Sequence, residues 1–509
     1  MTLASIQRDN TAEALDRELL AFVRPPGWQN PAPNAPYHLA VIGGGPAGLV
    51  AAHAAALLGA KVALVECHRL GGESLNYGSV PALAFTRTAR FYAEMRDAGR
   101  FGADSPTMGP VNIELAVSRA QHARSRIGQM HSAAKLKALG VDIYFGKARF
   151  TGPDTVEVDG ARLGFKKALI ATGASPKPVD IPGLAEAGYI EASTLLKLRT
   201  VPRRVLVIGG GTHGCEGAQA LARLGTYTII AMDEPLFLPG EERDAAAMVS
   251  DALARDGVEI HLNTRVTRVR VEASQKLVDL DNDGDITTVS VDEIFFGLGR
   301  EPSVAGLDLE RAGVAYDRAK GIGVDDFLRT SNPRIYAAGD VCLEPKFTSI
   351  AYASARIAVV NALFLRRKRF SELIIPWCTY TDPEIAHVGM YVRQARERGI
   401  PVKTFTVPMH EVDRAIINGE ETGFVKIHLR DGSDRILGAT IVARHAGEMI
   451  NEISLAITTG VGLNTLANVL RAYPTQAEAI RLAADQYRAT TMTSSRRWLV
   501  RAWLNRWVR

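Results

Sequence analysis

The chain has 509 residues, of which 47% are hydrophobic and 23% are charged, and its formal net charge is +5. This composition is typical of a soluble globular protein, and the length predicts about three domains. The last fourteen residues hold five arginines and no acid, so the rest of the chain is close to neutral, which argues against a nucleic-acid-binding protein.

The N-terminus and the cysteines bear on the cellular compartment. The first residues lack the basic region and hydrophobic core of a signal peptide, and no apolar run is long enough to span a bilayer. The cysteines are scattered without C-x-x-C spacing, so we interpret them as small packing residues of a reduced, cytoplasmic protein. They are Cys67, Cys215, Cys342 and Cys378.

Residues 1–36 are expected to form an N-terminal extension. A short helix is predicted from Leu15 to Phe22, and the prolines between Pro25 and Pro36 enforce an extended arm after it. Such an arm more often packs on its own domain than binds a partner, and we favour packing on its own domain.

A dinucleotide-binding unit begins at Tyr37. An apolar strand is followed by a G-x-G-x-x-G turn (Gly43, Gly45, Gly48), an Ala-rich helix and a second strand that ends in Glu66. Gly43 permits the tight turn, Gly45 lets backbone approach a pyrophosphate, and Gly48 lets helix and strand pack closely. The helix N-terminus favours phosphate, and Glu66 can bind both ribose hydroxyls.

The segment after Glu66 resembles the redox-active loop of the glutathione reductase, dihydrolipoamide dehydrogenase and mercuric reductase family. The family pattern is G-G-x-C-x-N-x-G-C-x-P-S-K, and the chain matches it at Gly71, Gly72, Asn76, Gly78 and Pro81. The two family cysteines fall on Ser74 and Ser79, and the family lysine falls on Leu83. The frame of a flavin-linked disulfide reductase is therefore present without its dithiol.

Two later stretches complete the predicted flavin site up to the second domain. Val141–Phe150 is predicted to be a strand, and it carries Ala148, which the resemblance implies as an FAD contact. A later strand ends in Ala171, Thr172 and Gly173, where the family chain leaves the flavin domain. Small residues there let backbone pass close to the cofactor.

A second dinucleotide-binding unit starts at Arg204. Gly209, Gly211 and Gly214 repeat the G-x-G-x-x-G spacing after a strand and before a helix. Two such units in this order predict a flavoprotein that binds FAD and NAD(P)H. Gly299 lies where the family approaches the nicotinamide, as does Gly297.

The choice of nicotinamide rests on the strand that follows. Met232 stands where an NAD-binding chain usually places its acid, and Asp233 and Glu234 come just after it. No arginine stands nearby in the sequence to bind a 2′-phosphate, and the acids would repel one, so NADH is favoured over NADPH. The run from Asp279 to Gly284 imitates a calcium loop but lacks its final glutamate and flanking helices, so we expect a hairpin turn there and no metal site.

The chain then returns to the flavin domain. In the family, the A-G-D segment, here with Gly339 and Asp340, places its aspartate on the ribityl chain of FAD. Ser349 replaces the usual histidine of the helix that follows.

Residues 371–487 resemble the interface domain of the family. Its Y-P-T-x-x-E segment carries Tyr473 and Glu478, and in the family this segment reaches the active site of the partner subunit. The resemblance therefore implies a homodimer.

These features predict an α/β protein with two Rossmann-like dinucleotide-binding domains and a C-terminal α+β interface domain. The expected domains are an extension (1–36), an FAD-binding domain (37–195 and 319–370), an NAD(P)-binding domain (196–318), an interface domain (371–487) and a basic Trp-rich tail (488–509).

The missing dithiol decides the expected chemistry. In the family, electrons pass from NAD(P)H to the flavin and then to the dithiol. A serine hydroxyl neither cycles its redox state nor ionises at neutral pH, so Ser74 and Ser79 cannot attack a disulfide or bind Hg²⁺. We expect them to fill space and favour this over a catalytic hydroxyl.

The flavin can still pass electrons directly to a small-molecule acceptor such as a quinone, and we favour such an NAD(P)H oxidoreductase. The alternatives are a catalytically impaired FAD-binding scaffold and a soluble transhydrogenase-like activity. Mercuric or disulfide reductase activity is disfavoured.

Two further residues are candidates for catalysis. In the family the lysine pairs with a glutamate near the flavin, here Glu216, so the loss at Leu83 leads us to expect that Glu216 is protonated or rebonded and that flavin reduction is slow. The phenol of Tyr473 could donate a hydrogen bond to a quinone oxygen, or it could be a buried interface tyrosine with a satisfied hydroxyl.

The last fourteen residues form an amphipathic pattern. Leu499, Val500, Trp503, Leu504 and Trp507 share one helix face, and Arg497, Arg501, Asn505 and Arg509 share the other. This is typical of an interfacial helix on anionic lipid, at the inner membrane surface. A tail helix that docks on the protein through its tryptophans is the alternative.

Overall fold

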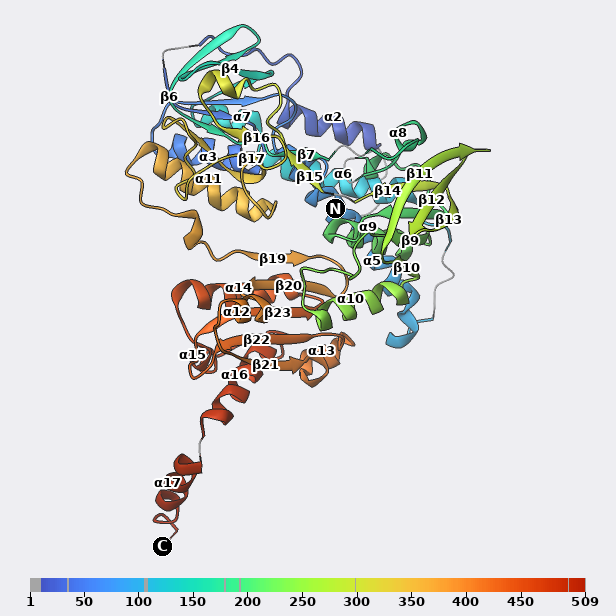
Figure 1. The fold of residues 1–509 in the computed structure, drawn as a ribbon, viewed down its shortest axis with the longest axis vertical. Coiled ribbons are helices and arrows are strands. Elements are labelled where there is room, and N and C mark those ends of the chain that lie inside the picture. Colours follow the sequence, from blue (N-terminus) through green and yellow to red (C-terminus); the bar gives the residue numbers. More distant parts are fainter. Residues whose placement is uncertain are drawn as a thin grey trace. The chain divides into compact units, whose positions relative to one another are not determined.

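The computed structural model describes residues 11–33, 36–104, 109–177, 180–191, 194–297, 299–492 and 494–508. It divides into two compact units, the first formed by Met1–Asp233 and Gly257–Glu372 and the second by Glu234–Asp256 and Leu373–Arg509 (Figure 1). Arg509 and the first ten residues, which entered the expectations above, lie outside the described residues. None of the described helices is both long and apolar enough to cross a membrane.

The first unit contains a seven-stranded sheet of the expected flavin domain. Its order is β3-β2-β1-β6-β5-β4, with β18 paired to β6. The strands β3, β2, β1, β6 and β18 are parallel, as a Rossmann-like unit requires, and β4 and β5 form an antiparallel hairpin. The bounds are β1 (Tyr37–Ile42), β2 (Val62–Glu66), β3 (Val141–Phe145), β4 (Ala148–Gly152), β5 (Thr155–Val158), β6 (Ala161–Ile170) and β18 (Ile335–Ala337).

One predicted strand is split. Val141–Phe150 forms β3 and β4, which are separated at Gly146. The N–H of Gly146 donates to the carbonyl of Glu66 (3.0 Å), and a Cβ at this position would lie 2.4 Å from Oδ2 of Asp159. A glycine is therefore needed where the chain turns from one sheet segment into the next.

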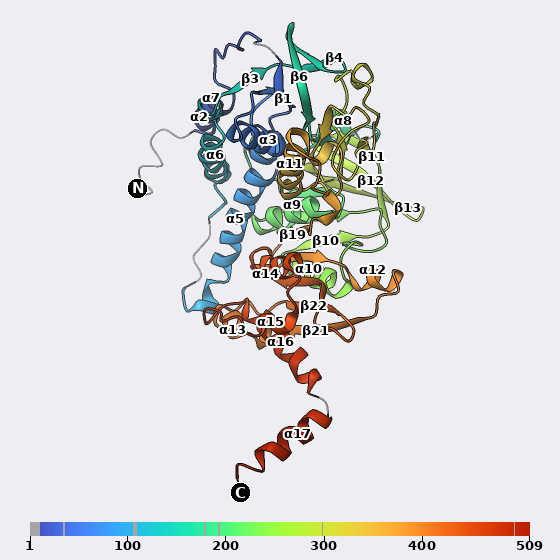
Figure 2. The ribbon, with the colours of Figure 1, turned by 90° about the vertical axis from the view of Figure 1, so that its left-hand side faces the viewer.

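Helices surround this sheet. α3 (Pro46–Leu57) and α11 (Thr348–Leu363) lie side by side, as Figure 2 shows. α5 (Ser79–Arg96) packs on α6 (Ile113–Met130) and on α9 (Thr212–Arg223). The short helices of the unit are α4 (Gly72–Asn76), α7 (Ala133–Ala138) and α8 (Leu184–Ala187).

The N-terminal extension lies on its own domain, as we expected. Its helix α2 (Ala12–Val23) is longer than predicted because Thr11 caps it through Ala14 N–H, and it packs on α6. In the arm that follows, the Arg24 guanidinium donates to the carbonyls of Cys67 and His68. Asn30 pairs with both backbone groups of Phe145, so the arm covers the edge of the sheet at β3.

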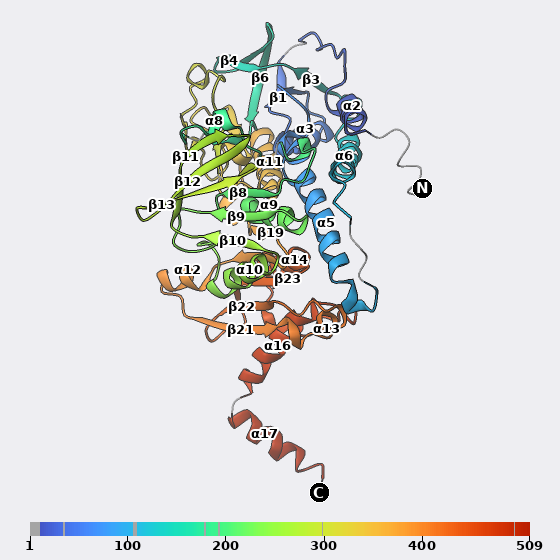
Figure 3. The same cartoon turned by 90° about the vertical axis from the view of Figure 1, so that its right-hand side faces the viewer.

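The second dinucleotide-binding unit is a parallel sheet of order β10-β9-β8-β14. A three-stranded antiparallel sheet, β11-β12-β13, is inserted in the chain between β10 and β14 (Figure 3). Asp283 (φ +52°) and Gly284 (φ +94°) join β12 to β13, which confirms the predicted hairpin turn. The bounds are β8 (Arg204–Ile208), β9 (Tyr227–Ala231), β10 (Val258–His261), β11 (Thr264–Glu272), β12 (Gln275–Asn282), β13 (Asp285–Val291) and β14 (Glu293–Phe296).

The first unit also contains two pairs of short strands. β7 (Ala174–Pro176) pairs with β15 (Arg300–Pro302), and β16 (Tyr316–Asp317) pairs with β17 (Gly321–Ile322).

The second unit is built on an antiparallel sheet of order β19-β20-β23-β22-β21. Its core is formed by residues of β20 to β23 with those of α14 and α16. α10 (Arg243–Arg255), which follows β9 in the chain, belongs to this unit. The other bounds are β19 (Pro376–Thr379), β20 (Glu384–Gly389), α12 (Val392–Glu397), β21 (Val402–Pro408), α13 (Asp413–Asn418), β22 (Phe424–Arg430), β23 (Ile436–Ala443), α14 (Ala446–Thr459), α15 (Leu463–Leu466) and α16 (Glu478–Thr491).

The tail begins later than expected. α16 continues through residues 488–491, so the boundary at 487 falls inside a helix. The tail helix α17 (Ser494–Leu504) contains no buried residue.

Candidate FAD and nicotinamide site

A large cavity of about 1470 Å³ lies in the first unit, at the carboxyl ends of β1, β2 and β6. It exceeds the roughly 300–1,000 Å³ that a drug-sized ligand occupies, as an extended dinucleotide requires. Most of the predicted flavin-site residues line it: Gly43, Gly45, Glu66, Gly72, Ser74, Ser79, Ala148, Thr172, Gly173, Gly339 and Asp340. Gly48 does not line the cavity and is buried in the turn.

Two positions of the first glycine turn, Gly43 and Gly48, leave no room for a side chain. A Cβ on Gly43 (φ +106°) would lie 2.3 Å from the carbonyl oxygen of Ala171, and one on Gly48 would lie 1.8 Å from that of Gly43. Gly45 caps α3 and faces Gly72, whose Cβ would lie 2.6 Å from the Cα of Gly45. The turn therefore leaves the N-terminus of α3 open to the cavity, where a diphosphate would accept its N–H groups.

Two carboxylates stand at the sites expected for FAD sugar hydroxyls. Oε2 of Glu66 accepts from Gly44 N–H and Oε1 accepts from His68 N–H, both at 2.6 Å, which leaves each oxygen able to accept another hydrogen bond. Burial raises the pKa of Glu66, and these N–H donors oppose the rise. Burial likewise raises the pKa of Asp340, against the charges of Arg300 and Lys346. The cradle and both acids fit FAD.

The redox loop carries hydroxyl groups where the family carries sulfur. Thr348 donates a hydrogen bond to Oγ of Ser74 (3.3 Å), and Ser79 is the first residue of α5. Asn76 is buried and holds the loop by donating to the carbonyls of Leu70 and Gly72. Ser74 and Ser79 both face the cavity as expected.

The four cysteines do not pair with one another in this structure. All four lie in described residues, and none forms a disulfide. The thiol of Cys215 is buried and donates to the carbonyl of Gly210, and that of Cys342 donates to the carbonyl of Gly339. Cys67 is exposed beside Glu66, and Cys378 belongs to the other unit.

Glu216 is buried in α9, and one of its partners is a histidine. The Nδ1 atom of His213 lies 3.7 Å from Oε2 of Glu216, one helical turn earlier. This contact raises the pKa of His213. Glu216 therefore has a histidine partner, and the expectation that it is protonated or rebonded stays a prediction. Leu83 is half-buried in α5.

The second glycine turn repeats the first. Gly209 has φ +100°, a Cβ on Gly214 would lie 2.0 Å from its carbonyl oxygen, and Gly211 caps α9. A Cβ on Gly299 would meet nothing within 4 Å. These four glycines do not line the large cavity, but His213 does.

The fold brings an arginine that is distant in the sequence to the acids after β9, and the preference for NADH stays a prediction. No arginine stands near Asp233 in the sequence, yet Arg265 pairs with Asp233 (Nη2 to Oδ2, 2.8 Å). Arg265 lies on β11, and the fold brings β11 next to the end of β9. A cation therefore lies beside the acids that follow β9, although Asp233 neutralises it.

Tyr473 and Glu478 lie in the second unit. The Tyr473 hydroxyl donates to Oδ2 of Asp413 (2.7 Å), which raises the pKa of Tyr473, and the side chain is 70% exposed. Glu478 pairs with Arg481 (2.6 Å). The hydroxyl is thus satisfied, but within one chain the tyrosine is not buried.

Sequence reasoning missed a charged pair in the cavity wall. Glu73 forms an ion pair with Arg300, and Nη2 of Arg300 also donates to the carbonyl of Ala174 (2.6 Å). Burial lowers the pKa of Arg300, and the nearby Asp340 opposes this. An acid directly after Gly72, in the segment that resembles the family's redox-active loop, was the available signal.

Comparison with known proteins places these features in one family. The model of the pyridine nucleotide-disulphide oxidoreductase family matches residues 37–355, and that of its dimerisation domain matches 375–484, which supports a homodimer. A mercuric reductase from Lysinibacillus sphaericus is 33% identical over 448 residues, covering 88% of this chain and 82% of that protein. A dihydrolipoyl dehydrogenase from Thermus scotoductus is 32% identical over 451 residues, covering 88% and 97%.

Solved structures agree with this assignment. LpdA from Mycobacterium tuberculosis has a TM-score of 0.80 at 27% identity and covers 88% of this chain and 99% of that one. The HOCl-induced flavoprotein disulfide reductase RclA from Escherichia coli has a TM-score of 0.78 at 27% identity, with the same coverage. The chain therefore belongs to the pyridine nucleotide-disulphide oxidoreductase family, as an FAD-dependent oxidoreductase with NAD(P)H as its electron donor.

Proposed function

We propose that this enzyme passes electrons from NAD(P)H through FAD directly to a small non-disulfide acceptor, with a quinone as the first candidate. The observation that carries the proposal is the pair of serines, Ser74 and Ser79, at the cavity wall where a dithiol would have to stand. Bound FAD supplies the redox chemistry, since the flavin ring accepts and donates electrons without help from sulfur.

The chain's own residues would bind and orient this cofactor. The N-terminus of α3 would hold the diphosphate, Glu66 would accept hydrogen bonds from the adenosine ribose, and Asp340 would accept from the ribityl chain. On the acceptor side, Ser74 and Ser79 present small neutral hydroxyl groups. His213 and Glu216 would hold a proton near the start of α9.

The names of the relatives suggest other substrates. Reduction of Hg²⁺ or of a disulfide needs a thiolate, because soft metal ions bind thiolate ligands and a disulfide exchanges only with a thiolate. Ser74 and Ser79 argue against both activities for this chain. A catalytically impaired scaffold or a transhydrogenase-like activity is the alternative, and Leu83 and Ser349 favour the scaffold.

One anaerobic experiment separates these functions. The purified flavoprotein is mixed with NADH or NADPH, and the flavin absorbance is followed before candidate acceptors are added. Bleaching followed by reoxidation with a quinone supports the proposal. Persistent yellow colour identifies a scaffold, reoxidation only by a second nicotinamide identifies a transhydrogenase, and turnover of Hg²⁺ or lipoamide contradicts the proposal.

We also propose that the tail rests on an anionic lipid surface. Trp498, Trp503 and Trp507 are 67%, 55% and 74% exposed, so within the described residues they do not dock on the protein. The arginines of the same segment, Arg496, Arg497, Arg501 and Arg506, are also exposed. In a flotation assay, a larger fraction of the full chain than of a chain that ends at residue 492 should float with anionic liposomes. Equal fractions would refute this role of the tail.

A further inference from the structure

A second basic and apolar surface lies far from the tail in the sequence, at the end of α11. Residues 364–369 read Phe-Leu-Arg-Arg-Lys-Arg and include no acid. Phe364 is 60% exposed, Leu365 is 69% exposed, and all four cationic residues are exposed. We refer to residues 364–369 as the basic loop.

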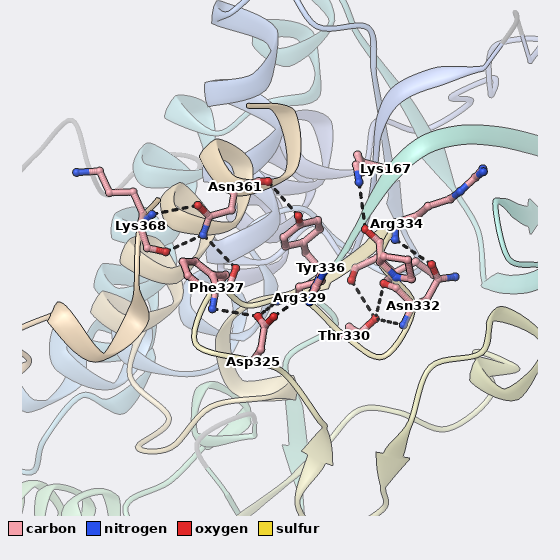
Figure 4. Close-up of polar contacts among 12 residues, drawn as sticks. Lys167, Asp325, Phe327, Arg329, Thr330, Asn332, Arg334, Tyr336, Asn361 and Lys368 are labelled. Atoms are coloured by element: carbon pink, nitrogen blue, oxygen red, sulfur yellow. Dashed lines mark hydrogen bonds and ion pairs between the residues drawn. The ribbon is translucent and has the colours of Figure 1, made fainter. Parts of the chain in front are cut away.

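The backbone of the basic loop is held by one buried side chain. The Nδ2 group of Asn361 donates to the carbonyls of Phe327 (3.1 Å) and Lys368 (2.7 Å), and its Oδ1 accepts from the N–H groups of Arg367 and Lys368 (both 3.2 Å), as Figure 4 shows in part. All the hydrogen-bonding capacity of this amide is used. The backbone of the loop therefore faces the protein while its side chains face solvent.

The end of the loop is fixed as well. Phe370 N–H donates to the carbonyl of Asp326 (2.8 Å), and Ser371 donates to both carboxylate oxygens of Asp326 (2.8 Å each). The guanidinium of Arg369 lies 5.6 Å from the centre of the Phe327 ring. The loop is thus a shaped surface, which lowers the ordering cost of binding.

Neighbouring cations extend the positive field. In Figure 4, Lys167 and Arg334 lie on the other side of Tyr336 from Asn361 and Lys368, and Arg329 lies close to Tyr336. Asp325 pairs with Arg329 (3.2 Å) and Asp154 pairs with Arg334 (3.0 Å), so two of these charges are neutralised. Burial and then repulsion from Arg366, Arg334 and Arg329 lower the pKa of Lys167, so Lys167 lies within electrostatic reach of Arg366 in the loop.

We propose that the basic loop binds the surface of an anionic phospholipid bilayer, with Phe364 and Leu365 inserted among the headgroups and Arg366, Arg367 and Lys368 paired with lipid phosphates. The chemistry selects lipid over nucleic acid, because two adjacent exposed apolar side chains gain nothing from a phosphodiester backbone but gain burial at a headgroup boundary. The inference is independent of the electron acceptor and of the tail.

The test uses vesicle co-sedimentation with a chain that ends at residue 492, so that the tail cannot contribute; α17 buries no residue, so its removal leaves the core intact. Vesicles are made of phosphatidylcholine with or without phosphatidylglycerol. Each basic residue near an anionic leaflet strengthens binding roughly five-fold, so R366Q/R367Q/K368Q should weaken binding on the order of a hundred-fold. The matched control, R126Q/R255Q/R268Q, removes the same charge from exposed positions elsewhere and should bind nearly as the parent does.

A second variant tests the apolar part. F364S/L365S should weaken binding to anionic vesicles about ten-fold or more while it keeps all charges. The flavin content and melting temperature of each variant report whether it is folded. The proposal is overturned if the parent does not bind anionic vesicles or binds neutral vesicles equally well. It is also overturned if R366Q/R367Q/K368Q and the control variant bind anionic vesicles with the same affinity. Unchanged binding of F364S/L365S would also overturn it and would identify a surface that binds polyanions by charge alone.

Discussion

Nδ1 of His213 lies 3.7 Å from Oε2 of Glu216, so a histidine on α9 meets the carboxylate that the resemblance pairs with a lysine at the position of Leu83. A histidine can lose its charge near neutral pH, whereas a lysine keeps its charge. The charge balance beside the proposed flavin site should therefore depend on pH in this chain.

The first prediction concerns stability. Because the pKa of His213 is raised, the contact stabilises the fold fully below the ordinary histidine pKa of about 6.5 and ceases to do so as pH rises through the raised value. His213 is 59% exposed, so the effect should be below about 1 kcal/mol. We expect H213Q to melt up to about 1 °C below the wild type at pH 6 and at the same temperature at pH 9. A difference that is equal at both pH values would contradict the pairing.

The second prediction concerns the Glu73–Arg300 pair. E73Q removes a negative charge next to the proposed diphosphate site, so it should retain FAD at least as tightly as the wild type. R300Q leaves a carboxylate there, so it should bind FAD about ten-fold more weakly or worse. FAD release on ultrafiltration, measured by fluorescence, gives both values. R149Q, which breaks the exposed pair with Glu157, serves as the control. Loss of FAD from E73Q would show that Glu73 itself supports the cofactor.

The third prediction concerns the choice of nicotinamide. Asp233 now neutralises Arg265, and D233N should release the guanidinium to bind a 2′-phosphate. We expect D233N to lower the KM for NADPH about ten-fold relative to that for NADH, and R265Q to abolish the gain in the double variant. Stopped-flow flavin reduction with each nicotinamide measures the change. An equal effect on both nicotinamides would exclude Arg265 from this role.

Whether a feature of the fold or the site could be predicted from the sequence depends on how far apart its residues stand in the chain. The glycine turns at Gly43 and Gly209 were predicted because motif, strand and helix are continuous in the chain. The Asp233–Arg265 pair was missed because Arg265 stands on β11, 32 residues after Asp233, and no local pattern joins the two. His213 could have been found, since it stands three residues before Glu216 on a predicted helix, where such side chains meet.

The structure also places one domain boundary differently from the sequence analysis. α10 follows a Rossmann strand but belongs to the second unit, because Glu242, at its start, pairs with Lys426 (2.8 Å) and His428 (2.9 Å) of β22. Such tertiary pairing leaves no mark in local sequence. The N-terminal arm packs on its own domain as expected, but it is not extended throughout, because Trp28 N–H donates to the carbonyl of Pro25 in a turn.

The fourth prediction concerns Tyr473. If its phenol donates to the acceptor in the dimer, Y473F should lower kcat/KM for a quinone about ten-fold and leave flavin reduction by NADH unchanged. D413N, which removes the charge of the Tyr473 partner but keeps an acceptor oxygen, is the matched control. If Y473F and D413N are both indistinguishable from the wild type in steady-state turnover, Tyr473 is structural.

The electron capacity of the enzyme tests the central claim most directly. An anaerobic dithionite titration counts the electrons taken up per FAD, and the count does not depend on the acceptor. A flavin without a dithiol takes up about two electrons, and we predict this value for the wild type and for a variant in which all four cysteines are replaced. The opposite result is an uptake of about four electrons per FAD in the wild type and about two in that variant. It would show that a pair of cysteines acts as a redox-active dithiol, and it would contradict the account.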